Sequence, residues 1–218
     1  MNVSILLYDR LTALDAIGPY EVLSRLPGAS LTFVAREPGP VRTDNGMLTL
    51  IAEKSIADVD APGILLVPGG PGEVAARAGG PVLDWLRSAH ETTTWTTSVC
   101  TGSLILAAAG LLEGRRATSH WLALEQLGRL GAVPVAERVV FDGKIVTAAG
   151  VSAGIDMALA LASEVAGERV AQAIALGIEY DPQPPFDSGS PAKAPADLVE
   201  LLRAGSRFET GEAVSSGS

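Results

Sequence analysis

The chain has 218 residues, of which 47% are hydrophobic and 19% charged, and its net charge of −9 argues against nucleic acid or an anionic membrane surface as a partner. This length can bury one α/β domain or two small ones, and we expect one. The single cysteine excludes an internal disulfide framework, residues 1–10 lack a signal-peptide pattern, and no apolar run approaches the roughly 20 residues of a bilayer span, so we expect a cytoplasmic protein with a reduced thiol.

The first elements along the chain are a strand and a broken helix. Residues 3–8 (VSILLY) form a continuous apolar run, which is typical of a parallel strand buried on both faces. A helical pattern follows and is expected to stop at Gly18-Pro19, before a further helical turn over residues 20–26. Asp15 lies just before this break, and its position alone leaves open whether it is a solvated charge or a functional acid.

The next strands lead to a glycine-rich loop. Residues 31–35 are predicted to form a second strand, and residues 41–51 a hairpin-like pair at the margin of the sheet. Residues 63–67 (GILLV) form the next buried strand, which runs into Pro68–Gly72. Glycines let backbone N–H groups approach a ligand closely, although they also serve turns that need positive φ. Because ligands of open α/β sheets bind beyond the carboxyl ends of strands, the loop is a candidate binding element.

The only cysteine lies at a predicted turn from strand to helix. Residues 93–99 are rich in β-branched and aromatic side chains, and a helical pattern begins at Gly102 and continues to Leu112. Such an elbow holds a nucleophile in a tight backbone conformation, and the N–H groups and dipole of the helix are expected to favour the thiolate of Cys100. The alternative is a free cysteine that is simply buried as a small apolar residue.

The second half of the chain continues the alternation of strands and helices. Ser119 is a predicted N-cap for a helix that ends at Gly128, and His90 is predicted to lie at the surface. Two strands flank Asp142-Gly143, which is a hairpin signal, and two apolar helices follow over residues 150–166 and 169–178, before an irregular proline-rich segment from Asp181. Strands alternating with helices predict a mostly parallel sheet covered on both faces, with its switch point beside Cys100.

Four stretches of the chain match a known pattern. They are residues 14–23 (LDAIGPYEVL), 67–72 (VPGGPG), 98–121 (SVCTGSLILAAAGLLEGRRATSHW) and 179–191 (EYDPQPPFDSGSP). Together they resemble the ThiJ/PfpI superfamily and, within it, the isocyanide hydratase branch. The resemblance implies a flavodoxin-like three-layer α/β sandwich, formed by a single class I glutamine amidotransferase-like domain over residues 1–195. A C-terminal helix and tail are expected over residues 196–218, and the protein is expected to form a homodimer.

The resemblance also assigns roles to individual residues. The nucleophile of the superfamily falls on Cys100, its threonine neighbour on Thr101 and its acid on Asp15, where aspartate in place of the commoner glutamate indicates the hydratase branch. Thr101 stands where PfpI-like peptidases have histidine, which argues against peptidase activity. The expected substrate-binding residues are Gly69, Gly70, His120 and Val151. The role expected for His120 is positional rather than catalytic.

The implied activity is the addition of water to an isocyanide, R–NC, to give an N-substituted formamide. Cys100 would attack the isocyanide carbon to form a thioimidate, and Asp15, with a pKa raised by burial and by the adjacent negative charge, would supply the proton. Thr101 and Gly70 would hold the intermediate or the water through hydroxyl and N–H groups. No metal or organic cofactor is expected.

The sequence is also compatible with two other classes of function. One is a redox-sensing or stress-response protein in which Cys100 oxidises reversibly. The other is a ligand-sensing domain like those of some transcription regulators, although the acidic charge and the lack of a recognisable helix-turn-helix segment count against it.

Overall fold

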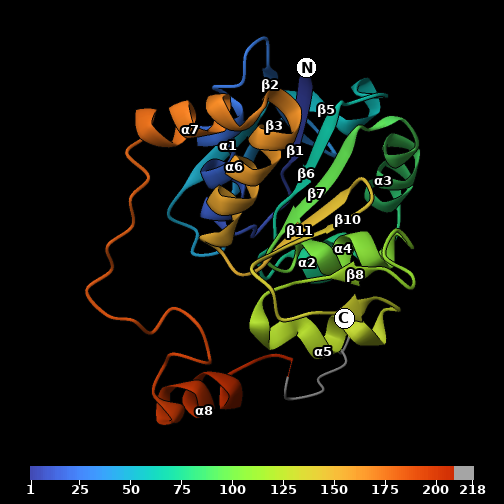
Figure 1. Ribbon diagram of the computed structural model, residues 1–218. Helices are drawn as coiled ribbons and strands as arrows, with labels where there is room; N and C mark the ends of the chain where they lie inside the picture. Colours follow the sequence, from blue (N-terminus) through green and yellow to red (C-terminus); the bar gives the residue numbers. More distant parts are fainter. Residues whose placement is uncertain (209–218) are drawn as a thin grey trace.

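The computed structural model describes residues 1–208, and within them the core is a seven-stranded sheet in the order β10-β11-β7-β6-β1-β2-β5 (Figure 1). Its strands are β1 (Asn2–Leu6), β2 (Ser30–Ala35), β5 (Lys54–Ser55), β6 (Ile64–Val67), β7 (Trp95–Val99), β10 (Val139–Asp142) and β11 (Ile145–Ala148). All neighbours pair in parallel except β10 and β11, which form the antiparallel hairpin predicted around Asp142-Gly143. The order β2-β1-β6-β7-β11 is the flavodoxin-like order, so the predicted fold class is confirmed.

Helices cover both faces of this sheet (Figure 1). One face carries α1 (Ala13–Leu23), α6 (Ala153–Ala166) and α7 (Glu168–Gly177), and the other carries α3 (Pro81–Thr92), α4 (Gly102–Ala108) and α5 (Leu124–Arg129). The smaller elements are α2 (Glu73–Ala76), α8 (Ala196–Ala204), the two-stranded sheets β3 (Gly39–Arg42) with β4 (Thr49–Ala52) and β8 (Arg116–Ala117) with β9 (Val133–Pro134), and 3-10 turns at Ile56–Asp58 and Trp121–Ala123.

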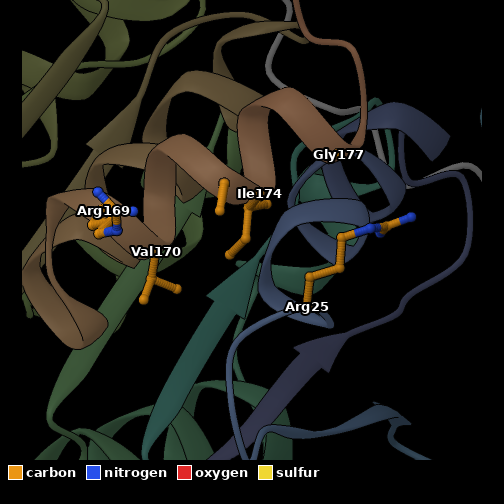
Figure 2. Close-up of a pocket in the computed structure, with 6 residues that line it drawn as sticks. Arg25, Arg169, Val170, Ile174 and Gly177 are labelled. Atoms are coloured by element: carbon orange, nitrogen blue, oxygen red, sulfur yellow. The ribbon is translucent and has the colours of Figure 1, made fainter.

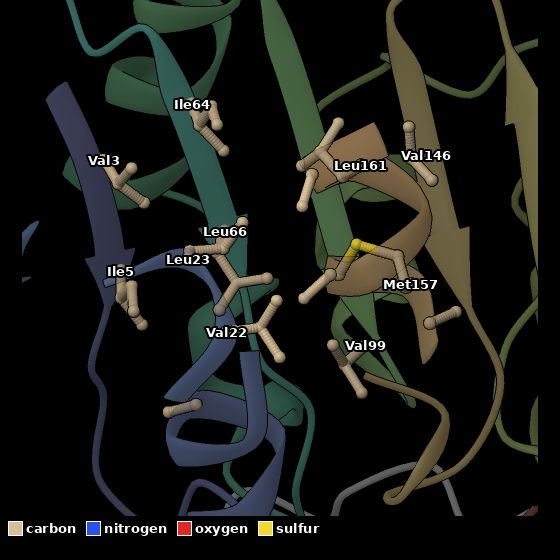
Figure 3. Packing of buried hydrophobic residues seen from close by; sticks show 14 of the residues in the cluster. Val3, Ile5, Val22, Leu23, Ile64, Leu66, Val99, Val146, Met157 and Leu161 are labelled. Atoms are coloured by element: carbon tan, nitrogen blue, oxygen red, sulfur yellow. The ribbon is translucent and has the colours of Figure 1, made fainter. Parts of the chain in front are cut away.

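The central strands β1 and β6 are mostly apolar on both faces because helices cover each face. Val3 and Ile5 of β1 point into the core beneath α1 and α6, whereas Leu6 points into the core beneath α3 and α4. Figure 3 shows the first of these cores, in which Met157 and Leu161 of α6 pack over the central strands. Side chains alternate across a strand, so a central strand with helices on both sides reads as one unbroken apolar run.

The switch point of the sheet lies between β1 and β6, because the chain runs from β1 to β2 on one side and later returns to β6 on the other. The prediction that it lies beside Cys100 is therefore displaced by one strand, since Cys100 follows β7. The carboxyl ends of β1, β6 and β7 nevertheless form one edge, and this edge carries Asp15, the glycine-rich loop and Cys100.

The predicted break at Gly18-Pro19 is wrong, since α1 runs through it as one helix with Pro19 inside. Close packing against α6 accounts for the continuity. A Cβ added at Gly18 would lie 3.0 Å from Ile155, and one added at Gly154 would lie 3.1 Å from Pro19. The two helices approach so closely that tertiary contact holds a segment that local preference alone would kink.

Two further expectations are corrected by local contacts. His90 is partly buried rather than on the surface, and its Nδ1 lies 2.8 Å from the Thr96 hydroxyl. The helix after the cysteine ends at Ala108 instead of Leu112, because Gly110 adopts a φ of 80° that terminates it. Among the helices of residues 1–208, none combines the length and apolarity that a bilayer span requires.

Candidate active site

Cys100 occupies a strained elbow between β7 and α4. Its φ of 56° lies in the left-handed region, which costs a non-glycine residue on the order of 1–2 kcal/mol. The backbone pays this cost through compensating contacts: the Cys100 N–H donates to the carbonyls of Ala148 and Ala149 at 3.0 and 3.1 Å, and the Ser119 hydroxyl donates to the Cys100 carbonyl at 3.0 Å. The predicted elbow is confirmed, and it fixes the direction of the thiol.

The Cys100 sulfur is enclosed, with only 6% of the residue exposed. Burial and the neighbouring Asp15 carboxyl raise the pKa of the thiol to about 12, although hydrogen bonds from the N–H groups of Thr101 and Val151 act in the opposite direction. The expectation of a thiol acidified by the following helix is wrong, because desolvation of the thiolate outweighs the donors that a seven-residue helix offers. Thiolate formation therefore requires a nearby proton acceptor.

Asp15 supplies that acceptor from the first turn of α1. The residue is fully buried, so the reading as a solvated charge is wrong. Its Oδ2 accepts a 2.9 Å hydrogen bond from the Gly69 N–H, whereas Oδ1 has no such partner among residues 1–208. Burial raises the pKa of the carboxyl to about 7, against the lowering effect of the hydrogen bonds from Gly69 and the Cys100 thiol. Asp15 and Cys100 are thus direct neighbours that can exchange a proton near neutral pH.

The glycine-rich loop packs directly against the elbow at Cys100 and Thr101. The Gly70 N–H donates to the Thr101 hydroxyl at 2.9 Å, and a Cβ at Gly69 would lie 2.5 Å from the Thr101 nitrogen and 2.9 Å from Asp15 Oδ2. Only glycine permits this approach. Because the Gly70 N–H bonds to the Thr101 hydroxyl, it is not free to hold an intermediate, whereas the expected role of Thr101 stays a prediction. The N–H groups that hydrogen-bond to the sulfur are those of Thr101 and Val151.

His120 and Val151 lie at the wall of a cavity of about 670 Å³. The expected N-cap at Ser119 is wrong, because the His120 ring caps the 3-10 turn by accepting from the Leu122 N–H at 3.3 Å, while Ser119 supports the elbow. Burial and the nearby Arg207 lower the pKa of His120, so the ring is neutral at pH 7. A Cβ at Gly150 would lie 2.6 Å from this ring, which places His120 as a packed wall residue.

Sequence reasoning missed two residues around the site. The Tyr8 hydroxyl donates to the Pro68 carbonyl at 2.8 Å, and burial raises its pKa well above the usual value, with further contributions from Asp15 and Glu73. Glu73 is fully buried and pairs with Arg77 at 2.6 Å and Arg207 at 3.3 Å. Tyr8 was hidden inside an apolar run and Glu73 follows the loop as an ordinary helix-forming residue, so neither carries a motif.

A second depression, of about 450 Å³, lies between the end of α1 and α7 (Figure 2). Arg25 and Arg169 flank an apolar floor that includes Val170 and Ile174. No residue of the cysteine site lines it. Within residues 1–208, no group of three or more His, Cys, Asp and Glu side chains is placed to hold a metal ion.

The fold and the cysteine elbow define a family. The DJ-1/PfpI family pattern matches residues 1–164, and the chain belongs to this family. The resemblance inferred from the sequence is confirmed.

Some members of the family and some solved structures are similar to this chain over most of its length. An isonitrile hydratase of Pseudomonas putida is 43% identical over 93% of this chain and 89% of its own length. Among solved structures, a THiJ/PfpI family protein from Pseudomonas syringae superposes with a TM-score of 0.90 at 36% identity, covering 93% of this chain and 84% of that one. Drosophila melanogaster DJ-1beta superposes with a TM-score of 0.75 at 26% identity, covering 82% and 97%.

Proposed function

We propose that the protein hydrates an isocyanide to an N-substituted formamide, with Cys100 as nucleophile and Asp15 as the proton-transfer group. The observation that carries the proposal is the buried pair of Cys100 and Asp15 beside a cavity, in a chain that is 43% identical to an isonitrile hydratase. An enclosed thiol with an adjacent carboxyl of pKa about 7 suits a reaction that needs a nucleophile and a proton donor in succession.

The first half of the reaction forms a carbon–sulfur bond. Asp15 takes the Cys100 proton, and the resulting thiolate attacks the isocyanide carbon. The protonated Asp15 then donates this proton to the same carbon. The product is the thioimidate Cys–S–CH=N–R, in which sulfur and hydrogen have both added to that carbon. The N–H groups of Thr101 and Val151 stabilise the thiolate before attack.

The second half consumes one water. Asp15, now a carboxylate, accepts a proton from water as the oxygen adds to the thioimidate carbon and passes it to the nitrogen, which gives R–NH–CH(OH)–S–Cys. The carbon–sulfur bond then breaks, the hydroxyl proton goes to Asp15, and the formamide leaves. The thiolate and the carboxylic acid are restored, so no external reductant or oxidant enters the balance.

The buried thiol gives less support to redox sensing. Sensor cysteines combine a low pKa with solvent access, whereas Cys100 is 6% exposed and its pKa is raised to about 12. The carboxyl of Asp15 can take and return a proton, which a hydration reaction needs and a thiol oxidation does not.

The test is turnover of para-nitrophenyl isocyanide, followed by infrared loss of the isocyanide and chromatographic appearance of the formamide. Cys100→Ala and Cys100→Ser should abolish turnover, and mass spectrometry of the wild type should detect an adduct equal in mass to one isocyanide. The matched control is Ser98→Ala, since this hydroxyl two residues away makes no hydrogen bond within residues 1–208. Full activity in Cys100→Ala, or an inert wild type, would reject the proposal.

A further inference from the structure

Neither Cys100 nor Asp15 lines the cavity of about 670 Å³, but residues that contact Cys100 do. Three of its wall residues hold the nucleophile: Ser119 donates to the Cys100 carbonyl, Ala149 accepts from the Cys100 N–H, and the Val151 N–H approaches the sulfur. These contacts place the cavity next to the thiol, so it is the space that the R group of a molecule reacting at Cys100 would enter.

Part of the cavity wall comes from residues 181–208, here called the C-terminal arm. The arm leaves α7, runs outside the body and returns through α8 toward α5 (Figure 1). Gly189–Ala192 and Arg203 of the arm line the cavity. The Arg203 guanidinium lies 5.7 Å from the centre of the Trp121 ring, which fixes the orientation of this flat side chain at the wall.

Two of the charged side chains of the wall pair with residues outside it, and the third stacks on an aromatic ring. Glu137 pairs with Arg116 at 2.6 Å, Arg138 pairs with Asp156, and Arg203 stacks on Trp121. The rest of the lining is mostly apolar, and it comprises Leu14, Trp121, Leu124, Ala136, Val151 and Pro191 among others. Paired charges and an apolar lining favour an uncharged, apolar occupant over an ionic one.

The volume indicates the size of this occupant. Pockets of roughly 300–1,000 Å³ enclose drug-sized ligands, and this cavity measures about 670 Å³. A small alkyl isocyanide would leave most of it filled with water, whereas a planar group of two rings would contact both Trp121 and the arm.

We propose that the substrate is an aryl isocyanide whose R group has two fused or linked rings and occupies the cavity that Trp121 and Gly189–Ala192 of the C-terminal arm line. This inference rests on the proposed function and adds the substrate class. The arm lies beyond residues 1–164, which match the family pattern, so the preference depends on a segment outside the part of the chain that this pattern describes.

The experiment compares methyl, phenyl, 2-naphthyl and 4-biphenylyl isocyanide as substrates. Burying each additional CH₂ equivalent is worth about a fourfold gain, so kcat/KM should rise at least tenfold from phenyl to the two-ring compounds. Ala136→Phe fills the cavity from its wall and should reduce the ratio of 4-biphenylyl to phenyl kcat/KM at least tenfold. Ala61→Phe, at an exposed alanine outside the cavity, is the matched control and should keep the wild-type ratio.

Binding of the corresponding N-aryl formamides to Cys100→Ser, measured by calorimetry, separates this inference from the proposed function. Tighter binding of two-ring formamides, weakened by Ala136→Phe, supports the substrate class even if no isocyanide turns over, in which case the proposed function alone fails. Turnover or binding that is uniform from methyl to 4-biphenylyl, or an Ala136→Phe variant with an unchanged ratio, overturns the inference.

Discussion

Asp15 decides whether the buried thiol can react near neutral pH. The thiol has a pKa of about 12 and the carboxyl one of about 7, so between these values the pair holds one proton, which rests on the thiol and can pass to the carboxylate during the reaction. Below pH 7 both groups are protonated and no thiolate is available. The reactive form of the site thus appears as pH rises through about 7, and it depends on both residues.

Asp15→Asn should reduce kcat/KM by roughly two to four orders of magnitude at pH 7, because the amide keeps the shape but neither accepts nor delivers a proton. The wild-type kcat/KM should rise through about pH 7 and then level off, whereas that of Asp15→Asn should keep rising about tenfold per pH unit to pH 9 or beyond, as the thiol ionises alone. A stopped-flow pH profile measures both curves. If Asp15→Asn had the kcat/KM of the wild type over this pH range, the carboxyl would have no part in the reaction.

Stability provides the control on folding for this variant. The folded pKa of Asp15 is raised from 3.8, so the wild type should lose stability as pH rises from about 4 through 7, since the folded state must then bury a carboxylate. Asp15→Asn lacks this penalty. At pH 8 its free energy of unfolding should exceed that of the wild type by a few kcal/mol, at about 1.4 kcal/mol per pKa unit, and the difference should vanish near pH 4. Urea titration at the two pH values checks the sign.

At the scale of elements, Arg207 ties the segment after α8 to the loop between β6 and α2. Its guanidinium donates to the Pro71 carbonyl at 2.9 Å and lies 3.3 Å from the Glu73 carboxylate. Burial raises the pKa of Glu73, while Arg77 and Arg207 lower it. The arm therefore stabilises the loop that carries Gly69 and Gly70, far from it in sequence.

Arg207→Gln should destabilise the protein by about 1–2 kcal/mol at pH 8, because the buried Glu73 carboxylate then keeps only Arg77 as a partner. Removing the cation raises the Glu73 pKa further, so the loss should be present above that pKa and shrink as pH falls and Glu73 becomes protonated. Glu73→Gln should cancel most of the effect in a double-mutant cycle. Arg169→Gln, at an exposed arginine with no ion pair among residues 1–208, is the control, and equal losses in both variants would exclude the coupling.

At the scale of the whole molecule, the face formed by α1, α6 and α7 is the expected homodimer interface. It contains a depression of about 360 Å³ lined by Ile17, Ile155 and Ile178, and the depression of Figure 2 shares Arg25 with it. Leu176 of α7 is 79% exposed. Adjacent hollows with exposed apolar side chains suit an isologous contact.

Light scattering at micromolar concentration should give twice the chain mass of 22.4 kDa. Leu176→Arg places a charge on the α7 face and should shift the protein toward monomer by at least tenfold in dissociation constant. Met47→Arg changes a more exposed residue, at 88%, in the turn between β3 and β4, and should leave the dimer intact. A 22.4 kDa wild-type particle would contradict the interface.

The sequence by itself determined the parallel sheet, the elbow and the acid, because each depends on local pattern or on matched motifs. Unbroken apolar runs such as residues 3–8 arise only where helices cover both faces, and Cys100 stands where a β-rich run meets a helical one. The order of strands and helices was therefore predictable. The predictions of a helix break at Gly18-Pro19 and of an N-cap at Ser119 were wrong because each segment contacts a partner far away in sequence. Gly18-Pro19 packs against α6, and Ser119 donates to the Cys100 carbonyl.

Only the tertiary structure decided the electrostatics and the walls of the site. Desolvation depends on every atom around a group, so the raised pKa of Cys100 and the neutral His120 followed from packing and not from residue type. Gly70 and Thr101 are 31 residues apart, and the hydrogen bond from the Gly70 N–H to the Thr101 hydroxyl occupies that N–H. The arm reaches Trp121 and the glycine loop through contacts across long sequence separations, and such contacts exist only once the chain has folded.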